Sequence, residues 1–495
     1  MFYKFFVLAY SFFFITSVQS QTFENTELCQ KAYKNIIALK LDSGLHYLKA
    51  EKLVNPSNNY VAYLKNYIDF LVVFTSGDMT HYEEKVKANF YQRIDLIQNS
   101  ETENSRYFLY IQAEIYLHSA ILSVMNKDYF VAVTHLRKAL KKLEQNVVKF
   151  PKFKENKKSL GLLYSILGSV PDNLKTGLAV IGLNGDINKG MSWLKELSSD
   201  TTFINQHETA TIYAFMLFHL NNEKEQAWQV LKENNFFGSQ NLMDKYSIAH
   251  IGIYGYHNEE ALMVLDSINI DSNYIDFPMI NYLTGIAKTY RQDDDANFYF
   301  KKFIGNYKGI DYLKSTYQKM AWNELIKGND ELYFNYIKQL EQHGRKLIDA
   351  DKQAAKEKDL LVPPDIVLLQ ARLLSDGKYT EEARAILEQY TQDDFLMPKN
   401  KMEYQYRLGR IYQKEDKLDS AIFYFQKTLD IDNQVEAYFT ANACYLIGYI
   451  YEQKKEKDTA LTYYQKSYKM NGYEYDNSIK QKAKAGINRL NKNLW

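Results

Sequence analysis

The chain has 495 residues, with 61 Lys and Arg against 60 Asp and Glu, so its formal net charge is only +1. This balance excludes the strongly basic composition that is typical of nucleic-acid-binding proteins. With 42 Tyr and 28 Phe but only 7 Pro and 21 Gly, the composition argues against a loop-rich fold and favours helix pairs that stack aromatic rings. The two cysteines, Cys29 and Cys444, stand near opposite ends of the chain. We therefore expect no disulfide and a fold that packing stabilises.

Residues 1–20 are typical of a cleavable signal peptide. A lysine precedes an apolar stretch from Phe5 to Ile15, and cleavage is expected before Gln21. The apolar stretch is shorter than the ~20 residues that a membrane-spanning helix needs, and no later stretch is long enough. We predict an exported protein of the periplasm or cell envelope, whose mature chain has no transmembrane segment.

Apolar periodicity and the positions of proline predict helices along the rest of the chain, and no segment alternates as a strand would. We expect three successive regions, namely N-terminal helical repeats over 21–200, middle helical repeats over 201–362 and C-terminal repeats over 363–495, in one continuous solenoid with a bend near 340–362. The expected helices lie near residues 24–54, 58–76, 80–98, 106–125, 129–148, 156–168, 172–182, 187–198, 206–220, 223–234, 241–254, 258–268, 278–290, 293–305, 310–327, 330–357, 364–375, 380–390, 400–414, 418–430, 435–453, 457–470 and 475–491.

A glycine-rich segment joins two of these helices at residues 182–190. Gly182 and Gly185 suit a tight turn with positive φ, and Asp186 can cap the next helix by accepting a backbone hydrogen bond. Gly190 lies one turn into that helix, where glycine costs ~1 kcal/mol, so it predicts a closely packed neighbour. A phosphate-binding loop would need a following Lys-Ser or Lys-Thr, or a preceding strand. We therefore expect these residues to be structural.

The clearest repeat signal lies near the C-terminus. Gly409 and Gly448 each follow a large aliphatic residue and precede a tyrosine by three positions, and Ala421 and Ala460 come twelve residues after them. In a helix pair, the glycine lets the two helices cross closely, and the small alanine keeps that approach open. Two adjacent copies with matching internal spacing are strong evidence for a repeat. The copies cover residues 402–432 and 441–471.

The same spacing of an alanine and a large apolar residue four positions later recurs upstream, as in Ala132 with Leu136 and Ala296 with Phe300. This is the second-helix signature of the tetratricopeptide repeat. We therefore predict an all-α fold, a tetratricopeptide-type α-solenoid of stacked antiparallel helix pairs.

Part of the chain resembles a particular tetratricopeptide family. The helix that contains Leu160-Gly161-Leu162-Leu163, the break at Gly168-Ser169-Val170-Pro171 and the segment 182–190 follow each other as in the tetratricopeptide repeat protein 39 family, which is related to a fungal inclusion-body clearance protein. Leu183 departs from that family, which has an aromatic residue there. With its export signal, the chain also resembles uncharacterised exported repeat proteins of Bacteroidota-type bacteria. Both resemblances imply a helical scaffold without enzymatic residues.

Residue patterns that carry chemistry do not emerge from the sequence. The nine histidines are dispersed without metal-ligand spacing, and His118 lies among apolar residues as a core histidine would. We expect no catalytic residue, metal or cofactor. The basic runs Lys138–Lys142 and Lys152–Lys158 are interpreted as a solvated helix face and a linker that need no partner.

Our functional hypothesis is an exported, non-enzymatic scaffold that binds an unidentified protein or peptide, and no nucleic acid, in a concave tetratricopeptide groove. The candidate groove residues lie on the first helices of the two clearest repeats. They are Tyr404, Arg407, Arg410, Tyr445 and Tyr449.

The alternative is a glycan-binding outer-membrane protein of the SusD type, which is also built on tetratricopeptide helices. Such proteins resemble this chain in scaffold and export. They usually carry a lipidated cysteine after the leader and Trp-rich insertions, whereas this chain has neither and contains only four Trp.

Overall fold

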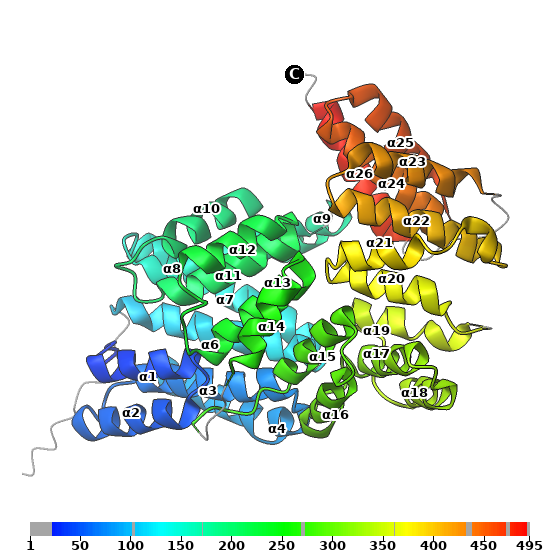
Figure 1. The fold of residues 1–495 in the computed structure, drawn as a ribbon. Coiled ribbons are helices and arrows are strands. Elements are labelled where there is room, and N and C mark those ends of the chain that lie inside the picture. The colour runs from blue at the N-terminus through cyan, green and yellow to red at the C-terminus, as the bar shows by residue number, and fades with distance from the viewer. Residues whose placement is uncertain are drawn as a thin grey trace, which may run out of the picture. The chain divides into compact units, whose positions relative to one another are not determined.

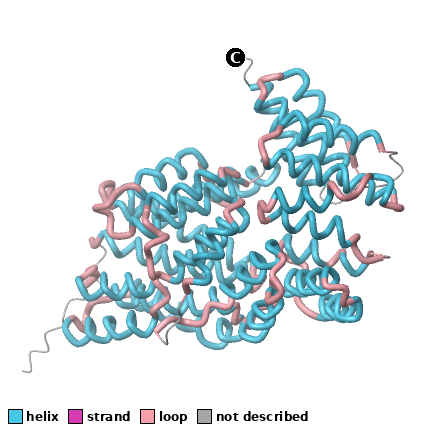
Figure 2. The backbone as a smooth tube through the Cα atoms, in the orientation of Figure 1, coloured by secondary structure: helices cyan, strands magenta, loops and turns pink. Residues whose placement is uncertain are grey.

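The computed structural model describes residues 22–100, 104–170, 172–268, 273–360, 362–431, 438–471 and 476–492. These residues are helices joined by loops (Figure 1, Figure 2), and their one β-type contact is an isolated parallel bridge between Thr22 and Asn58. The predicted all-α fold is confirmed. The predicted signal peptide, residues 1–20, lies outside the described residues.

Two compact units make up the described chain. Unit 1 consists of the described residues of Met1–Phe74, Met79–Thr209 and Asp271–Ile275, and unit 2 of those of Thr75–Asp78, Ala210–Ile270 and Asp276–Trp495. Most of the regions predicted as 201–362 and 363–495 thus belongs to unit 2.

Unit 1 is a stack of helices in which the pairs α1/α2, α6/α7 and α8/α10 pack most extensively. Its elements are α1 (Glu27–Ile37), α2 (Leu41–Val54), α3 (Tyr60–Ser76), α4 (Met79–His81), the π-helical turn η1 (Tyr82–Val86), α5 (Lys87–Gln98), α6 (Arg106–Met125), α7 (Tyr129–Lys149), α8 (Lys154–Ser169), α9 (Asp172–Val180) and α10 (Ile187–Ser198).

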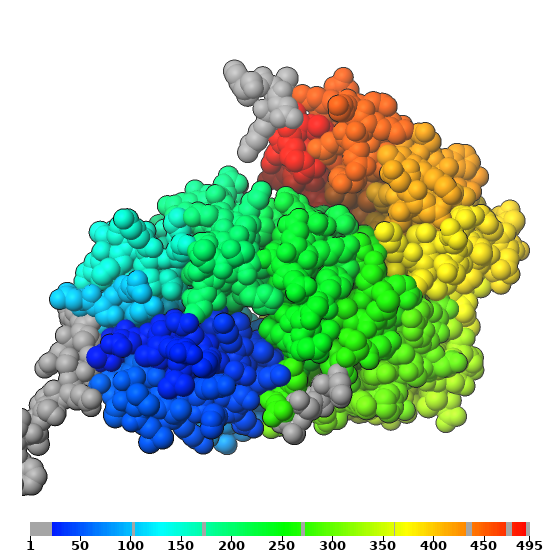
Figure 3. Space-filling view, turned by 60° about the vertical axis from the view of Figure 1, so that its left-hand side comes forward, coloured from blue at the N-terminus to red at the C-terminus, as the bar shows by residue number. Residues whose placement is uncertain are grey.

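Unit 2 continues with helix pairs that follow one another along the chain. The yellow-to-red C-terminal helices form a continuous packed mass (Figure 3). Its elements are α11 (Gln206–Met216, which begins in unit 1), η2 (Leu217–Asn221), α12 (Lys224–Glu233), α13 (Leu242–Gly255), α14 (Asn258–Asp266), α15 (Met279–Arg291), α16 (Ala296–Asn306), α17 (Leu313–Ile326), α18 (Asp330–Gln342), α19 (Asp349–Ala354), η3 (Glu357–Asp359), α20 (Ile366–Asp376), α21 (Thr380–Leu387), η4 (Gln392–Asp394), α22 (Pro398–Lys414), α23 (Leu418–Asp430), α24 (Tyr438–Gln453), α25 (Lys457–Lys469) and α26 (Asp476–Lys492).

Ten helix endings in the described chain share one backbone conformation. The turn residue has φ between 56° and 78°, and the N–H of the next residue donates to the carbonyl five positions before it, as in the Schellman ending of a helix. This ending satisfies a terminal carbonyl and reverses the chain within a few residues, so helix pairs such as α22 and α23 pack antiparallel. The ten residues are Leu39, Lys127, Gly182, Asn235, Tyr256, Gln292, Gly328, Lys378, Asp416 and Lys455.

Two helices that the sequence predicts as single elements are divided in the structure, so these two predictions are wrong. The predicted helix over 24–54 is interrupted at Leu39, whose φ of 65° ends α1 before α2 begins. The predicted helix over 330–357 ends at Gln342, and Gly344, with a φ of 76°, turns the chain before the short α19. In both cases a left-handed residue ends a helix that apolar periodicity alone would continue.

A buried ionic network links several helices of unit 1. The Lys158 amine lies 2.9 Å from a carboxylate oxygen of Glu208 and 3.3 Å from one of Glu114, and the hydroxyls of Tyr33 and Tyr67 donate to Glu208. Although burial opposes the shift, the two carboxylates raise the pKa of Lys158 well above its usual value. The interpretation of 152–158 as a solvated linker is therefore wrong for Lys158, which is buried between two acids.

Helix α6 is apolar because it packs among buried groups of unit 1. Within the part of the chain that the structure describes, it is the one helix long and apolar enough to span a membrane, and 78% of that stretch is buried inside the protein. On it, His118 accepts or donates one hydrogen bond with Asn66 at 3.1 Å and stacks on Phe70, and burial lowers its pKa to about 3. The prediction of a core histidine is confirmed. Cys29 and Cys444 are free and buried, as expected.

Candidate functional site

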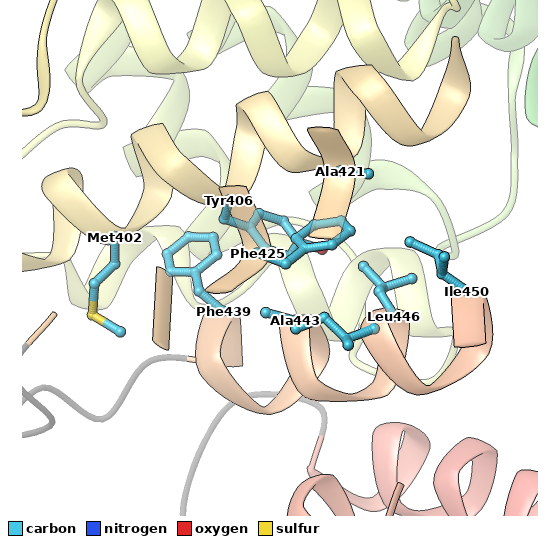
Figure 4. Packing of buried hydrophobic residues seen from close by; sticks show 9 residues of the cluster. Met402, Tyr406, Ala421, Phe425, Phe439, Ala443, Leu446 and Ile450 are labelled. Atoms are coloured by element: carbon cyan, nitrogen blue, oxygen red, sulfur yellow. The ribbon is translucent and has the colours of Figure 1, made fainter. Parts of the chain in front are cut away.

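The first C-terminal repeat closes around the contact between Gly409 of α22 and Phe425 of α23. A methyl group at Gly409 would lie only 2.5 Å from the Phe425 ring, so only glycine permits this approach. Ala421, which is fully buried, sits at the same crossing. Phe425 then packs with Tyr406 and Phe439 in the core that joins α22, α23 and α24 (Figure 4).

The second repeat reproduces this crossing. A methyl group at Gly448 of α24 would lie 2.8 Å from Tyr464 of α25, and Ala460 is fully buried beside it. Tyr464 also fills the space next to Gly486 of α26, so the last helix covers the apolar face that the second repeat would otherwise expose. In both repeats, the glycine and the alanine thus lie where the two helices of the pair cross.

A polar cavity of about 340 Å³ opens beside these repeats in unit 2. Its walls come from α19, α20, α22, α24 and α26. The described residues that line it include five cations and one carboxylate, namely Arg372, Arg407, Arg410, Lys414, Lys482 and Asp376. We call this space the basic cavity.

The cations of the basic cavity are not equally neutralised. Arg407 donates two hydrogen bonds to the Glu403 carboxylate, at 2.6 and 3.0 Å, and Arg372 lies 3.9 Å from Asp376. Arg410, by contrast, makes no hydrogen bond or ion pair with any described residue, although it is partly buried. Arg410 instead shares the charge of Asp376 with Lys414, Arg372 and Arg407. The lining therefore holds more cations than carboxylates, and Arg410 keeps hydrogen-bond donors suited to an anion.

Lys414 adds a cation whose charge depends on pH. Its amine donates to the backbone carbonyl and the hydroxyl of Ser375 and lies 3.8 Å from Asp376. Burial, reinforced by the charges of Arg410 and Arg407, lowers the pKa of Lys414 to about 7 against the opposing pull of Asp376. The amine is therefore partly charged near neutral pH.

A second cavity, of about 430 Å³, adjoins the basic cavity. We call it the mixed cavity, because apolar side chains such as Trp322, Val362 and Met397 line it together with charged ones. The two cavities share Arg372 and Arg407 as well as two further lining residues. They are therefore neighbouring cavities with a shared wall, one basic and the other partly apolar.

Glu357 holds one wall of the mixed cavity in place. Its carboxylate accepts hydrogen bonds from the indole N–H of Trp322 at 2.8 Å, the amide of Gln318 at 3.0 Å and the hydroxyl of Tyr333 at 3.3 Å. These bonds tie the short helix η3 to α17 and α18. The wall is thus fixed by a buried, hydrogen-bonded acid.

The five residues predicted to line a groove occupy different environments. Arg407 and Arg410 do line a cavity. Tyr404 is buried in the core between α20, α21 and α22, where its hydroxyl donates to the carbonyl of Tyr390 at 2.7 Å, so its inclusion among exposed groove residues is corrected. Tyr445 packs against the cores of both repeats, and Tyr449 is 37% exposed and stacks on it.

Sequence reasoning missed the other cations of the site. Arg407, Arg410 and Lys414 follow each other at intervals of three and four residues, which places them on one face of α22. From this spacing, Lys414 could have been predicted as a third cation on the same face of α22. Arg372 and Lys482 come from helices far apart in sequence, and nothing local marks them as neighbours of α22.

The glycine-rich segment 182–190 is structural, although one detail was wrong. Gly182 has a φ of 77°, and Asp186 caps α10 by accepting from the backbone N–H of Lys189 at 3.0 Å. Gly185 does not have positive φ. It is required because a methyl group there would lie 2.3 Å from the backbone of Gly168.

Gly190 meets the expectation of a close neighbour. A methyl group there would lie 2.6 Å from the carbonyl oxygen of Gly161 and 2.4 Å from the hydroxyl of Ser165, both on α8. Helices α8 and α10 therefore cross as closely as the two C-terminal pairs do.

Comparison with protein families agrees with the C-terminal repeats. Residues 403–435 and 441–473 match the tetratricopeptide repeat family. The chain is thus an all-α protein with tetratricopeptide repeats, a module that supports protein interaction. The comparison with curated proteins found no match, so the resemblance to the tetratricopeptide repeat protein 39 family and to Bacteroidota-type proteins stays a prediction.

Proposed function

We propose that the chain is a non-enzymatic scaffold that holds a protein partner through an acidic segment bound in the basic cavity. Tandem tetratricopeptide repeats support a role in protein interaction. The observation that carries the choice of ligand is the excess of cations in the lining, five against one carboxylate, together with Arg410, which makes no hydrogen bond or ion pair with a described residue. Carboxylates are natural ligands for arginine, since the planar guanidinium donates two parallel hydrogen bonds to them.

Charge selection in a partly enclosed cavity should be stronger than on an open surface. Several lining groups are withdrawn from water, which weakens screening and strengthens each charge–charge interaction. Asp376 does not cancel this selection, because a single carboxylate faces four cations: burial raises its pKa, but the charges of Lys414, Arg372, Arg407 and Arg410 together lower it below its usual value. The site therefore has room for a further anion.

Binding of defined fluorescent peptides tests this function directly. An acidic hexapeptide of Asp and Glu should bind, a Lys hexapeptide should not, and the affinity for the acidic peptide should fall as NaCl is raised. The variant Arg410→Gln should weaken binding at least about tenfold, which corresponds to ~1.4 kcal/mol.

Lys427→Gln on α23 is a matched control, because Lys427 is exposed and does not line either cavity. Equal affinity for acidic and uncharged peptides, or an Arg410→Gln variant that binds like the unmodified protein, would contradict the proposal. Tighter binding of a single-stranded oligonucleotide than of the acidic peptide would contradict it too.

The proposed scaffold acts outside the cytoplasm, in the periplasm or at the cell envelope. The support is the leader-like sequence of residues 1–20. Expression of the full chain in a bacterium that exports through signal peptides, followed by N-terminal sequencing, should give a mature protein that begins at Gln21. An intact N-terminus in the cytoplasmic fraction would refute export.

A further inference from the structure

The mixed cavity adds a second requirement to the ligand, and the inference rests on the proposed function. We propose that the site selects a segment in which an acidic residue is followed closely by an apolar one, the acid in the basic cavity and the apolar side chain in the mixed cavity. The wall that the two cavities share, which includes Arg372, Arg407 and Tyr438, is the observation that places the two halves next to each other.

Arg372 and Arg407 line both cavities, and each guanidinium packs against an aromatic ring. The Arg372 guanidinium lies 4.8 Å from the centre of the Trp322 ring, and that of Arg407 lies 5.8 Å from the Phe439 ring. A guanidinium that rests on an aromatic ring uses its flat face and keeps its N–H groups for acceptors in its own plane. The flat face of each guanidinium thus lies against a ring that lines the mixed cavity, while Arg407 donates to Glu403 and Arg372 lies 3.9 Å from Asp376.

The rim of the mixed cavity exposes apolar side chains. Leu360 and Val362, two residues apart, and Met397, from another part of the chain, are 40%, 47% and 45% exposed. Large apolar groups gathered around a cavity are typical of a binding site, whereas scattered ones are ordinary. An apolar side chain of a ligand would remove them from water.

The charge of the shared wall decides which apolar ligand fits. A purely apolar segment in the mixed cavity would strip water from the donors of Arg372, which lies 3.9 Å from Asp376, without replacing it, and this is unfavourable. A neighbouring carboxylate or phosphate accepts from those donors and offsets the loss. The occupant is therefore a segment that carries an oxyanion next to its apolar anchor.

Matched peptides test whether the site requires an apolar residue next to the acidic one. Three peptides of equal length share one acidic core and differ at the adjacent position, which is Leu, Ser or phosphoserine. The Leu peptide should bind the full chain about five- to tenfold more tightly than the Ser peptide, since one buried leucine is the only difference. The phosphoserine peptide puts a further oxyanion in place of the apolar side chain beside the same acidic core, and tighter binding of it than of the Leu peptide would overturn the apolar requirement.

Adjacent residues supply the variants for this test. Met397→Ser combined with Val362→Ser should abolish the preference for Leu and leave the affinity for the Ser peptide unchanged, whereas Leu396→Ser, 93% exposed and outside the cavity, should change neither. A Leu peptide that binds less than twofold better overturns the inference. If both peptides still bind and Arg410→Gln weakens both, the proposed function stands alone; if neither peptide binds, both fall.

Discussion

The amine of Lys414 and the carboxylate of Asp376 lie 3.8 Å apart in a cavity that four other cations line. Because burial lowers the pKa of Lys414 to about 7, its charge is largely present at pH 6 and largely lost at pH 9. The variant Lys414→Met should therefore weaken acidic-peptide binding clearly at pH 6 and little at pH 9. Fluorescence anisotropy at the two pH values measures this difference.

The same amine should affect stability in the opposite sense. An unfolded lysine stays protonated up to its ordinary pKa near 10.4, so the unfolded chain binds more protons than the folded one between about pH 7 and 10. The contribution of Lys414 to the free energy of unfolding should thus rise with pH across that window. Urea unfolding of Lys414→Met should lack this slope, while Lys417→Met, with an exposed side chain three residues away, should retain it.

Gly409 tests the helix crossing of the first repeat. The added methyl group of Gly409→Ala would meet the Phe425 ring at 2.5 Å, so we expect a loss of about 1–3 kcal/mol in the free energy of unfolding. Gly305→Ala on α16 is the control, because no atom lies within 4 Å of its added methyl group. Alanine favours the helix there, and thermal unfolding should show a gain of up to ~1 kcal/mol. Equal effects at the two sites would show that the crossing tolerates a side chain.

Asp351 tests how α19 is fixed to α17. Its fully buried carboxylate accepts from the backbone N–H groups of Tyr312 at 2.7 Å and Ser315 at 2.9 Å, so it caps α17 from another element. Asp351→Ala should lower the free energy of unfolding by about 1–2 kcal/mol. Asp349→Ala, whose side chain is 87% exposed, should change it by less than ~0.5 kcal/mol. Chemical denaturation of both variants gives the comparison.

The pH dependence of Asp351 has a definite sign. Burial raises its pKa to about 6, so the folded state holds the proton more tightly than the unfolded state does. Between about pH 4 and 6 this group therefore lowers stability as pH rises. The Asp351→Ala variant should show a shallower decline over that range than the unmodified protein, and an unchanged profile would argue against a buried carboxyl there.

Lys158 tests the buried network of unit 1. Lys158→Met would leave the carboxylates of Glu114 and Glu208 buried without their cation, which is expected to cost about 3–5 kcal/mol. The preceding residue is a natural control, because Lys157 pairs with Glu196 at a partly exposed site and Lys157→Met should cost less than ~1 kcal/mol. Calorimetry should show the large effect in Lys158→Met alone.

The helical fold and the two C-terminal repeats could be predicted from local signals. Gly409 and Gly448 each stand next to an aliphatic residue, three positions before a tyrosine and twelve before an alanine. Each helix crossing can therefore be predicted from a short stretch of sequence. The helix endings could not be predicted equally well. Eight of the ten helix endings with a left-handed residue use a residue other than glycine, such as Asp416 or Lys455, and carry no compositional mark.

The site combines residues that are far apart in the sequence, so its full lining could not be predicted from local patterns. Arg407 and Arg410 were accessible as neighbours on one helix face, whereas Arg372 joins them only because α20 packs against α22. Tyr404 was misassigned for a related reason. A tyrosine on a first helix suits either a groove or a core, and only the packing of α20 and α21 against it decides for the core.

The two cysteines give each compact unit its own chemical reporter. Cys29 belongs to unit 1 and Cys444 to unit 2, both are fully buried, and burial raises the pKa of each thiol to about 11. Neither thiol should react with an alkylating reagent while its unit stays closed, since the thiolate is the reactive form. The rate at which each becomes labelled under mild denaturant would therefore time the opening of one unit independently of the other, without any engineered probe.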